Sequence, residues 1–325
     1  MKIVLIGLGN QGSKRKKIAS SDYIASVDPN NTAADYTDIR QVPLDRFDAA
    51  LLCTPDTAKS SLIKYLIMRK KHVLVEKPLL LSSTQSFVDL AAMAKKHQTV
   101  CYVAYNHSFE PHFINMKKLI QNNTLGKIYH CRLFYGNGTA QSVKSSPWRD
   151  TGSGVLADLG SHVLFCLYDW FGEQILKRNF IVQMSRAFET NAPDHVVFAD
   201  YHAHMTIEAE VSLLSWQNSF SCDIIAEHGS AHINSLCKWG PSQFIVRQRT
   251  LPCGRPTEKI NTLVMDDPTW QLEYDYFKNL CTTEEYFPNF KIQCWLARTL
   301  TTMSKAALHK ARIYCIAAHE ASNEY

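Results

Sequence analysis

The chain has 325 residues, 46% of them apolar and 20% charged, and its formal net charge is +5. These values are ordinary for a globular protein and exclude a disordered, collagenous or low-complexity chain, while the length favours two domains. The small charge excess gives no reason to expect nucleic acid as a partner. The longest apolar runs, such as 49–53 and 163–167, fall far short of the roughly 18–20 residues of a membrane-spanning helix, so we expect no membrane association.

We find no targeting signal near the amino terminus. The apolar run 3–6 is too short for a signal peptide, and a basic stretch at 14–17 stands where a cleavage site would lie. The ten cysteines are scattered without a C-x-x-C pair, a pattern typical of small buried residues in a reducing compartment. We therefore expect a cytoplasmic protein with no metal site.

The residues 1–105 alternate between short apolar runs and segments with helical spacing. Helical spacing marks 57–70 and 82–97, and Ser82 or Ser83 offers an N-cap for the second of these. Strands that alternate with helices of this length predict a parallel sheet built from βαβ units. The predicted strands are 2–6, 23–28, 49–54, 72–77 and 99–105.

The rest of the chain changes character, because strands follow one another there. The helix 153–171 interrupts them, 111–122 links the two halves, and 270–281 and 291–318 return to helical spacing. We therefore predict an α/β protein: a Rossmann domain at 1–120 with a doubly wound parallel sheet, then an α/β domain at 121–325 with a large, mostly antiparallel open sheet and C-terminal helices. The predicted strands of this second domain are 127–135, 179–185, 194–204, 206–215, 219–226, 243–249 and 260–265.

A glycine-rich hexapeptide directly follows the first predicted strand and precedes a helix, and Asp28 ends the second strand. This arrangement is the dinucleotide-binding fingerprint: a tight turn, free N–H groups at a helix start for the pyrophosphate, and a carboxylate about 20 residues further on for the ribose hydroxyls. A plain strand–turn–helix is the alternative. The predicted cofactor-binding residues of this fingerprint are Gly7, Gly9, Asn10, Gln11, Gly12 and Asp28.

Asp28 also bears on the choice between NAD and NADP. A carboxylate there repels a 2′-phosphate, and the residues 29–31 offer no arginine to bind one, so NAD is favoured over NADP. The basic run 14–17 on the first helix would weaken that preference. We interpret this run as a solvated basic face, rather than as a contact for nucleic acid or a nuclear targeting signal.

Further candidate residues follow the carboxyl ends of the predicted strands, where open parallel sheets bind ligands. They are Thr54-Pro55, Glu76-Lys77-Pro78 and Tyr105-Asn106. A lysine ammonium near a nicotinamide ring polarises a substrate carbonyl or hydroxyl, and partial desolvation lowers a lysine pKa toward the range of proton transfer. For this segment taken alone, the favoured interpretation is that Lys77 is a solvated lysine at a strand end, paired with Glu76.

A second motif, Gly152–His162, opens the helix predicted in the second half. Asp158 and His162 are four residues apart, so an α-helix places them on one face. A carboxylate one turn from an imidazole orients the ring and stabilises its protonated form, as a general base requires. A structural or exposed Asp/His pair is the alternative for this motif taken alone.

Together these motifs resemble the glucose–fructose oxidoreductase / inositol dehydrogenase / rhizopine-catabolism (Gfo/Idh/MocA) family. The features occur in the family's order: the glycine turn, Asp28, Thr54-Pro55, the HVLVEKP segment 72–78 and the GSGVLADLGSH segment 152–162. The resemblance implies a Rossmann domain followed by a substrate-binding α/β domain, whose open sheet joins subunits into a homodimer or homotetramer. It also implies hydride transfer between a nicotinamide cofactor and a sugar, polyol or sugar derivative, including nucleotide-linked sugars.

The resemblance assigns roles to individual residues. Lys77, Asp158 and His162 are the catalytic residues that it implies: Lys77 contacts the reacting oxygen, His162 exchanges the proton, and Asp158 supports His162 or contacts substrate. Lys59 stands where the family often has a histidine, which puts one contact on the cofactor side in doubt. A nicotinamide-binding regulator or scaffold without catalysis is the alternative function. The further implied cofactor residues are Cys53, Thr54, Pro55, Glu76, Lys77 and Asn106, and Trp148 and Arg149 are candidates for the substrate.

Overall fold

The computed structural model describes residues 1–322 apart from 148 and 203, with side chains described as far as 313. The chain forms two compact units. The first combines Met1–Phe109 with Pro268–Ala297, and the second combines Glu110–Asp267 with the chain from Arg298 onward. This division differs from the sequence boundary at 120/121, because a helix near residue 275 belongs to the first unit.

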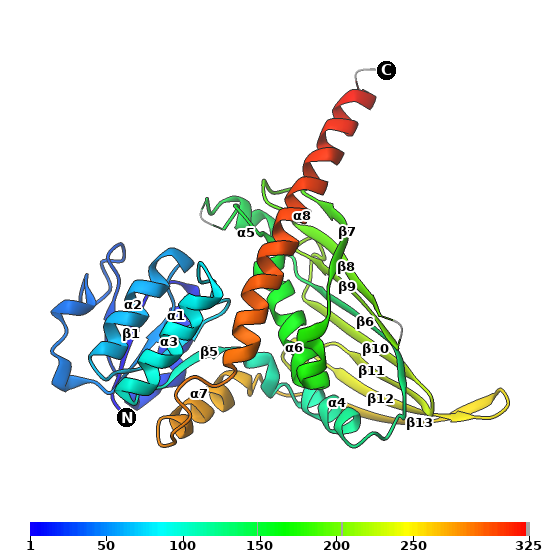
Figure 1. The fold of residues 1–325 in the computed structure, drawn as a ribbon, viewed down its shortest axis with the longest axis horizontal. Coiled ribbons are helices and arrows are strands. Elements are labelled where there is room, and N and C mark those ends of the chain that lie inside the picture. Colours follow the sequence, from blue (N-terminus) through cyan, green and yellow to red (C-terminus); the bar gives the residue numbers. More distant parts are fainter. Residues whose placement is uncertain (148, 203, 323–325) are drawn as a thin grey trace. The chain divides into compact units, whose positions relative to one another are not determined.

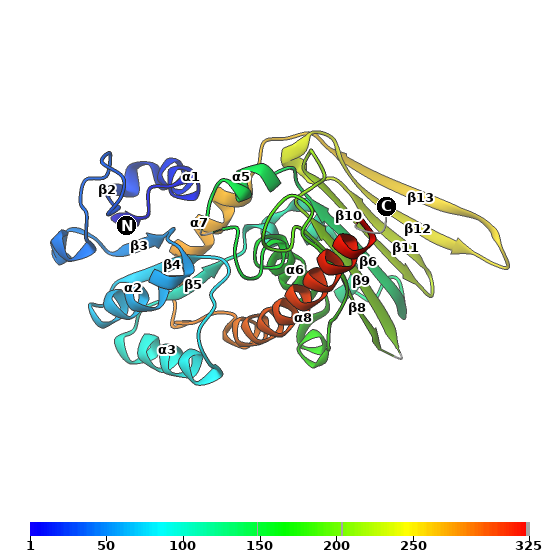
Figure 2. The ribbon, with the colours of Figure 1, turned by 90° about the horizontal axis from the view of Figure 1, so that it is seen from above.

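The first unit contains a parallel sheet of five strands in the order β2-β1-β3-β4-β5. Its strands are buried apolar runs, as expected when helices cover both faces. Figure 2 shows α1 and α7 on one side of these strands and α2 and α3 on the other. The strands are β1 (Ile3–Ile6), β2 (Tyr23–Val27), β3 (Ala49–Leu52), β4 (His72–Glu76) and β5 (Cys101–Ala104), and the helices are α1 (Asn10–Ala19), α2 (Asp56–Met68), α3 (Thr84–His97) and α7 (Thr269–Leu280).

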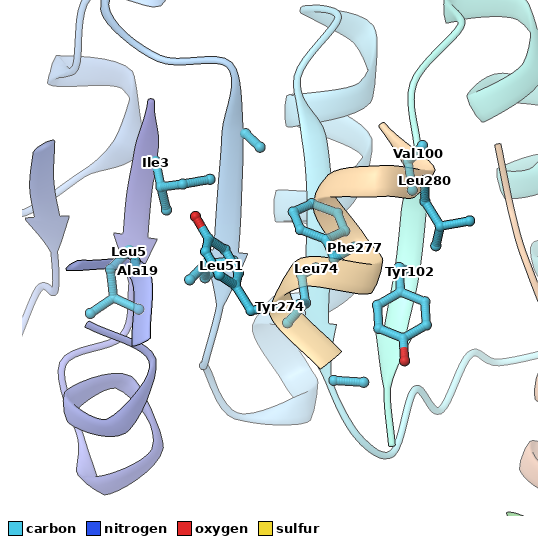
Figure 3. Close-up of a cluster of buried hydrophobic side chains, with 12 residues drawn as sticks. Ile3, Leu5, Ala19, Leu51, Leu74, Val100, Tyr102, Tyr274, Phe277 and Leu280 are labelled. Atoms are coloured by element: carbon cyan, nitrogen blue, oxygen red, sulfur yellow. The ribbon is translucent and has the colours of Figure 1, made fainter. Parts of the chain in front are cut away.

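Helix α7 completes the core of this unit, although more than 150 residues separate it from β5 in the sequence. Its residues Tyr274, Phe277 and Leu280 pack against strand side chains such as Leu51 and Leu74, as Figure 3 shows. All five side chains are at most 3% exposed. The Rossmann sheet therefore obtains one of its covering helices from a distant part of the chain.

The second unit contains an eight-stranded sheet in the order β13-β12-β11-β10-β6-β9-β8-β7. Its neighbours are antiparallel apart from β6 and β9, which pair in parallel. The mostly antiparallel open sheet is confirmed, but one of its strands, β11 (Gly229–Asn234), was not predicted. The other strands are β6 (Ile128–Gly136), β7 (Ile181–Arg186), β8 (His195–His202), β9 (Met205–Ser212), β10 (Ser219–Ala226), β12 (Ser242–Thr250) and β13 (Gly254–Leu263).

Helices α4 (Pro111–Gln121) and α6 (Ser161–Phe171) lie against one face of this sheet (Figure 1). The indole N–H of Trp170 on α6 donates to the carbonyl oxygen of Phe113 on α4, at 3.1 Å. The predicted helix 153–171 is interrupted, because Leu156–Gly160 forms a π-helical turn before α6 begins. The remaining helices are α5 (Ala140–Lys144) and α8 (Phe290–Ser322).

The cysteines that the structure describes form no disulfide. Most are buried or half-buried, but Cys253 in the turn between β12 and β13 is exposed, contrary to the expectation of a buried residue. Within the described residues no group of three metal-ligating side chains gathers. No helix among them is long and apolar enough to span a membrane.

Candidate active site

The glycine turn lies where the strand order of the parallel sheet reverses. Strand β1 sits between β2 and β3, so the chain passes from β1 to β2 on one side and then returns across β1 to β3 on the other. Open α/β sheets bind ligands outside the carboxyl ends of the strands at this switch point. The turn Gly7–Gly12 follows β1, and Cys53 and Thr54 follow β3. The Cys53 N–H donates to the carbonyl oxygen of Ile6 at 2.7 Å and joins the two strand ends.

The three glycines of the turn differ in the atoms that an added side chain would meet. A Cβ at Gly7 would lie 2.5 Å from the carbonyl oxygen of Cys53, and Gly7 has a φ of +93°. A Cβ at Gly12 would lie 2.0 Å from the carbonyl oxygen of Gly7. A Cβ at Gly9 would meet no protein atom within 4 Å, and its φ is −84°. The fold therefore requires Gly7 and Gly12, whereas Gly9 leaves open space beside the start of α1.

These residues fit the pyrophosphate of a dinucleotide. Gly9 is the N-cap of α1, which has no side-chain cap, so the first N–H groups of the helix remain available to an anion. The open space at Gly9 matches the close backbone approach that the second glycine of the fingerprint permits. The Thr54 hydroxyl nearby is buried without a hydrogen-bond partner among the described residues. Both features fit a bound group that the chain itself does not supply.

Asp28 follows β2 and is tied to the glycine turn. Its Oδ2 accepts a hydrogen bond from the N–H of Leu8 at 2.8 Å, and its Oδ1 accepts from the N–H groups of Asn30 and Asn31 at 2.9 and 3.1 Å. The Asn31 amide donates back to the carbonyl oxygen of Leu8 at 3.1 Å. The carboxylate is thus fixed beside the glycine turn, where the fingerprint places the adenosine ribose.

The interpretation of the run 14–17 as a solvated basic face is wrong for one of its residues. Arg15 is only 1% exposed, and its Nε lies 2.6 Å from Oε1 of Glu76. Its second guanidinium nitrogen lies 2.6 Å from Oε2 of Glu273 on α7. The physical reason is the helical period, since Arg15 falls on the face of α1 that carries Gly12 and Ala19 inward. Lys14, Lys16 and Lys17 are exposed as predicted.

Burial and charge act together on the carboxylates around Arg15. Desolvation raises the pKa of Glu273 from 4.5 to about 7; Arg15 opposes this rise and the Glu76 charge adds to it. The Tyr102 hydroxyl donates to Oε1 of Glu273 at 3.3 Å. Burial is the main cause, and the guanidinium that Glu273 shares with Glu76 offsets only part of it. Sequence patterns gave no signal for this cluster, since Arg15 and Glu273 are 258 residues apart.

The segment after β4 carries Lys77. Lys59, in the first turns of α2, is 3% exposed and reaches this segment: its Nζ donates to the carbonyl oxygen of Pro78 at 2.8 Å. The same Nζ lies 2.6 Å from Oδ1 of Asp56. Burial lowers the pKa of Lys59, and the Asp56 charge offsets part of this effect. Lys59 therefore binds the chain beside Lys77.

The remaining predicted cofactor residues of the first unit lie at the same edge of the sheet. Asn106 follows β5, is 7% exposed, and donates from its amide nitrogen to the Thr269 hydroxyl of α7 at 2.7 Å. Burial raises the pKa of the Cys53 thiol well above its ordinary value, so Cys53 is an inert thiol there. Pro55 is the N-cap residue of α2.

The second unit holds the other two catalytic candidates. Asp158 lies in the π-helical turn, and its Oδ2 is 3.6 Å from the guanidinium of Arg149. The predicted α-helical turn between Asp158 and His162 is replaced by a wider one, since the Ser161 N–H donates to Leu156 O, five residues earlier. Such turns are frequent at functional sites. Trp148, the other substrate candidate, lies outside the described residues.

His162 lies in the first turn of α6, among its buried residues, and is 9% exposed. The ring of Tyr135 on β6 lies 6.1 Å from the His162 ring, and the Trp239 ring lies 6.0 Å from Tyr135. Burial raises the pKa of Tyr135 well above its ordinary value. Neither aromatic residue was predicted as part of the site, because a strand at 127–135 gives no reason to connect Tyr135 with His162.

The loop before the π-helical turn is hydrogen-bonded to the segment 190–193. Oδ1 of Asp150, a residue 5% exposed, accepts from the N–H groups of Asn191 and Ala192 at 2.7 and 2.9 Å. Gly154 has a φ of +49°, and a Cβ there would lie 2.2 Å from the carbonyl oxygen of Pro193. The close approach of Pro193 requires a glycine at position 154, so packing alone accounts for this glycine of the motif.

Each unit therefore assembles part of the predicted site. The first brings the glycine turn, Asp28, Thr54, Glu76-Lys77 and Asn106 to the carboxyl edge of one parallel sheet. The second gathers Asp158, His162 and Arg149 around the π-turn and α6. Lys77 belongs to the first unit, and Asp158 and His162 belong to the second.

A parallel sheet with a glycine turn at its switch point defines a dinucleotide-binding Rossmann fold. The chain belongs to the Gfo/Idh/MocA oxidoreductase family: residues 1–105 match the model described as "Oxidoreductase family, NAD-binding Rossmann fold", and residues 113–232 match the "GFO/IDH/MocA C-terminal domain". The family resemblance and the α/β architecture predicted from the sequence are thereby confirmed.

Curated relatives and solved structures agree with this family. A myo-inositol 2-dehydrogenase of Thermotoga maritima is 32% identical over 87 residues, covering 26% of this chain and 25% of the relative. A glucose-6-phosphate 3-dehydrogenase of Bacillus subtilis is 23% identical over 163 residues, covering 49% and 46%. The matched region of this chain spans a quarter to a half of the length of these relatives. The structure of a levoglucosan dehydrogenase in complex with NADH has a TM-score of 0.78 at 17% identity, covering 96% of this chain and 98% of that one.

Proposed function

We propose that the protein is an NAD(H)-dependent oxidoreductase that transfers hydride between nicotinamide and a C–OH or C=O group of a sugar, polyol or sugar derivative. The observation that carries the proposal is the open space at Gly9, beside an uncapped helix start and the fixed carboxylate of Asp28. The match of residues 1–105 to the NAD-binding family model supports it.

Three residues carry the chemistry in this proposal. When bound, the nicotinamide accepts or donates the hydride. In the oxidative direction His162 takes the proton of the substrate hydroxyl, and in reduction it returns one. Lys77 stabilises the negative charge that develops on the reacting oxygen, by electrostatic complementarity to the transition state. Asp158 supports His162 or contacts substrate hydroxyls, and Arg149 beside it accepts an anionic group of the substrate.

The substrate class follows from what the relatives act on. Their names specify myo-inositol, glucose 6-phosphate and levoglucosan, all of which carry several secondary hydroxyls. Arg149 is compatible with a phosphorylated, nucleotide-linked or acidic sugar. Pocket loops decide among these compounds, and the fold alone does not.

The first test is calorimetric titration of the purified protein with NADH and, separately, with NADPH. We expect tight NADH binding and much weaker NADPH binding, because the Asp28 carboxylate repels a 2′-phosphate. A preference for NADPH would overturn the Asp28 argument and leave the enzyme class standing. Binding of neither would contradict the proposed function and favour a scaffold of the same fold.

The second test is turnover with a panel of myo-inositol, glucose 6-phosphate, levoglucosan and nucleotide-linked sugars. Lys77→Met and His162→Ala should each lower kcat by at least about 100-fold, while the NADH dissociation constant changes little. Lys64→Met, on the exposed face of α2, is the matched control. Full activity in both site variants would refute the assignment of these residues.

We also propose that the eight-stranded sheet joins two copies of the chain. Helices α4 and α6 lie against one face of the sheet (Figure 1). In the strand register Ile225 pairs with His130, His130 with Thr206, and Thr206 with Tyr201. Paired residues point to the same side of a sheet, so Ile225 and Tyr201 share a face. Ile225 is 42% exposed and Tyr201 is 60% exposed. Light scattering should give a dimer or tetramer; a monomer at micromolar concentration would contradict this proposal.

A further inference from the structure

Two buried cations contact the chain on either side of Lys77. Arg15 is 1% exposed and Lys59 is 3% exposed, although lysine and arginine are seldom buried. Arg15 lies on α1 and binds the residue before Lys77, and Lys59 lies on α2 and binds the residue after it. Two helices thus converge on the two neighbours of one side chain.

Arg15 holds the amino-terminal neighbour through a side chain. Its Nε donates to Oε1 of Glu76 at 2.6 Å, and its second nitrogen donates to Oε2 of Glu273 at 2.6 Å. The guanidinium carbon also lies 4.5 Å from the centroid of the Trp270 ring. Glu273 and Trp270 both belong to α7. Glu76 is therefore fixed to two helices through one planar group that cannot rotate without losing a contact.

Lys59 holds the carboxyl-terminal neighbour through the main chain. Its Nζ donates to the carbonyl oxygen of Pro78 at 2.8 Å and is paired with Asp56 at 2.6 Å. A bond to a carbonyl fixes the backbone itself, independently of the side chain at that position. The backbone entering and leaving Lys77 is thus restrained on both sides.

Stability alone does not account for this arrangement. A buried ion pair loses much of its Coulombic gain to desolvation, and apolar residues of similar volume often replace such a pair without loss. Both buried cations contact the neighbours of Lys77, a side chain whose position matters for the proposed reaction. Reacting groups must be held to within about half an ångström, and a misplacement of 1 Å can cost about 100-fold in rate.

We propose that Arg15 and Lys59 are positioning residues, which hold the peptide that carries Lys77 through the Glu76 carboxylate and the Pro78 carbonyl and so set where the Lys77 ammonium reaches. This inference rests on the proposed function, in which Lys77 contacts the reacting oxygen. It gives Glu76 a role different from the cofactor contact implied by the family resemblance. It also gives a role to the buried Arg15, whereas its neighbours in the run 14–17 are exposed.

The chain supplies matched variants for a test. Arg15→Lys and Lys59→Arg keep the charge but change the contact geometry, because a lysine cannot bridge two carboxylates as the guanidinium fork does. Circular dichroism checks that each variant is folded. Arg15→Met and Lys59→Met remove the cation. Lys17→Met on α1 and Lys64→Met on α2 alter exposed lysines of the same helices and serve as controls.

We expect kcat to fall about 100-fold in the two methionine variants and about 10-fold in the charge-preserving ones, with less than threefold change in the NADH dissociation constant. The controls should match the wild type. If Lys77→Met abolishes turnover while Arg15→Lys and Lys59→Arg keep kcat within twofold, the positioning inference is overturned. If Lys77→Met itself retains full turnover, the proposed role of Lys77 fails instead, which is a distinguishable result.

A second readout needs no turnover. Trace acylation of lysines, followed by mass spectrometry, measures the reactivity of Lys77 relative to Lys17 within the same molecule. We expect the relative reactivity of Lys77 to rise at least threefold in Arg15→Lys and Lys59→Arg, since the peptide loses a restraint. Unchanged reactivity in both variants, with circular dichroism showing folded protein, would overturn the inference.

Discussion

The carboxyl group of Glu273 makes the stability of the protein depend on pH in an unusual direction. Its pKa is raised by burial from 4.5 to about 7, so the folded state binds a proton that the unfolded state releases between these values. The free energy of unfolding therefore falls as pH rises from 4.5 to about 7. Each tenfold change in proton affinity is worth about 1.4 kcal/mol, so the full effect is about 3 kcal/mol.

Glu273→Gln removes this effect while preserving the shape of the side chain. At pH 5 the protonated carboxyl and the amide are nearly equivalent, and we expect similar stabilities. At pH 8 the variant should be more stable than the wild type by about 3 kcal/mol, because the wild type then carries an ionised carboxylate that shares Arg15 with Glu76. Since His72 and His112 have pKa values lowered by burial, their titration is common to both proteins and cancels in the difference.

Urea unfolding followed by circular dichroism at pH 5, 6, 7 and 8 measures this difference directly. Glu284→Gln, which changes an exposed acid of the same unit, is the control and should show a constant offset. A difference between Glu273→Gln and wild type that does not change with pH would refute the reasoning. So would a variant that is less stable at pH 8, since Arg15 would then hold Glu273 ionised throughout.

Three further predictions follow from packing and turn geometry. Leu51→Ala should lower the free energy of unfolding by about 2–5 kcal/mol, because the side chain is fully buried. Val88→Ala, at an exposed position of α3, should change it by less than about 0.5 kcal/mol; urea denaturation checks both. Gly9→Ala should weaken NADH binding at least tenfold without lowering the urea midpoint, whereas Gly7→Ala should lower the midpoint, since its Cβ would meet Cys53 O. Asp150→Ala should lower the free energy of unfolding by about 1–3 kcal/mol, measured by urea denaturation, since it leaves the buried N–H of Ala192 and the part-buried N–H of Asn191 without this acceptor.

The first sheet and its glycine turn were predictable because their signals are local. A buried apolar run followed by Gly7–Gly12 is visible within a dozen residues, and so is the cap of α3, where the Ser83 hydroxyl accepts from the Ser86 N–H at 3.2 Å. The strand β11 was not predicted because only two of its residues, Ala231 and Ile233, are apolar, too few for their alternation with polar residues to mark a strand. Its identity as a strand comes from pairing with β10 and β12.

The candidate site was predictable only in part. Residues at strand ends were found from chain order, but the contacts that hold them were not. Arg15 looked like part of a solvated run because Glu273, its buried partner, is supplied by a helix that follows the whole second sheet in the sequence. The contact between Tyr135 and His162 was not predictable for the same reason: it forms only where β6 packs against α6.

Helix α7 has a consequence for how the protein is made. The first 109 residues contain all five strands of the Rossmann sheet, but the helix that buries Leu51 and Leu74 follows only at 269–280. While the ribosome is synthesising the second sheet, the part of the first sheet that α7 covers lies exposed, and the Arg15 guanidinium lacks one of its two carboxylates. The amino-terminal unit is thus completed only after the whole second sheet has been made. A chain cut before residue 268 should therefore expose an apolar surface that binds chaperones and promotes aggregation.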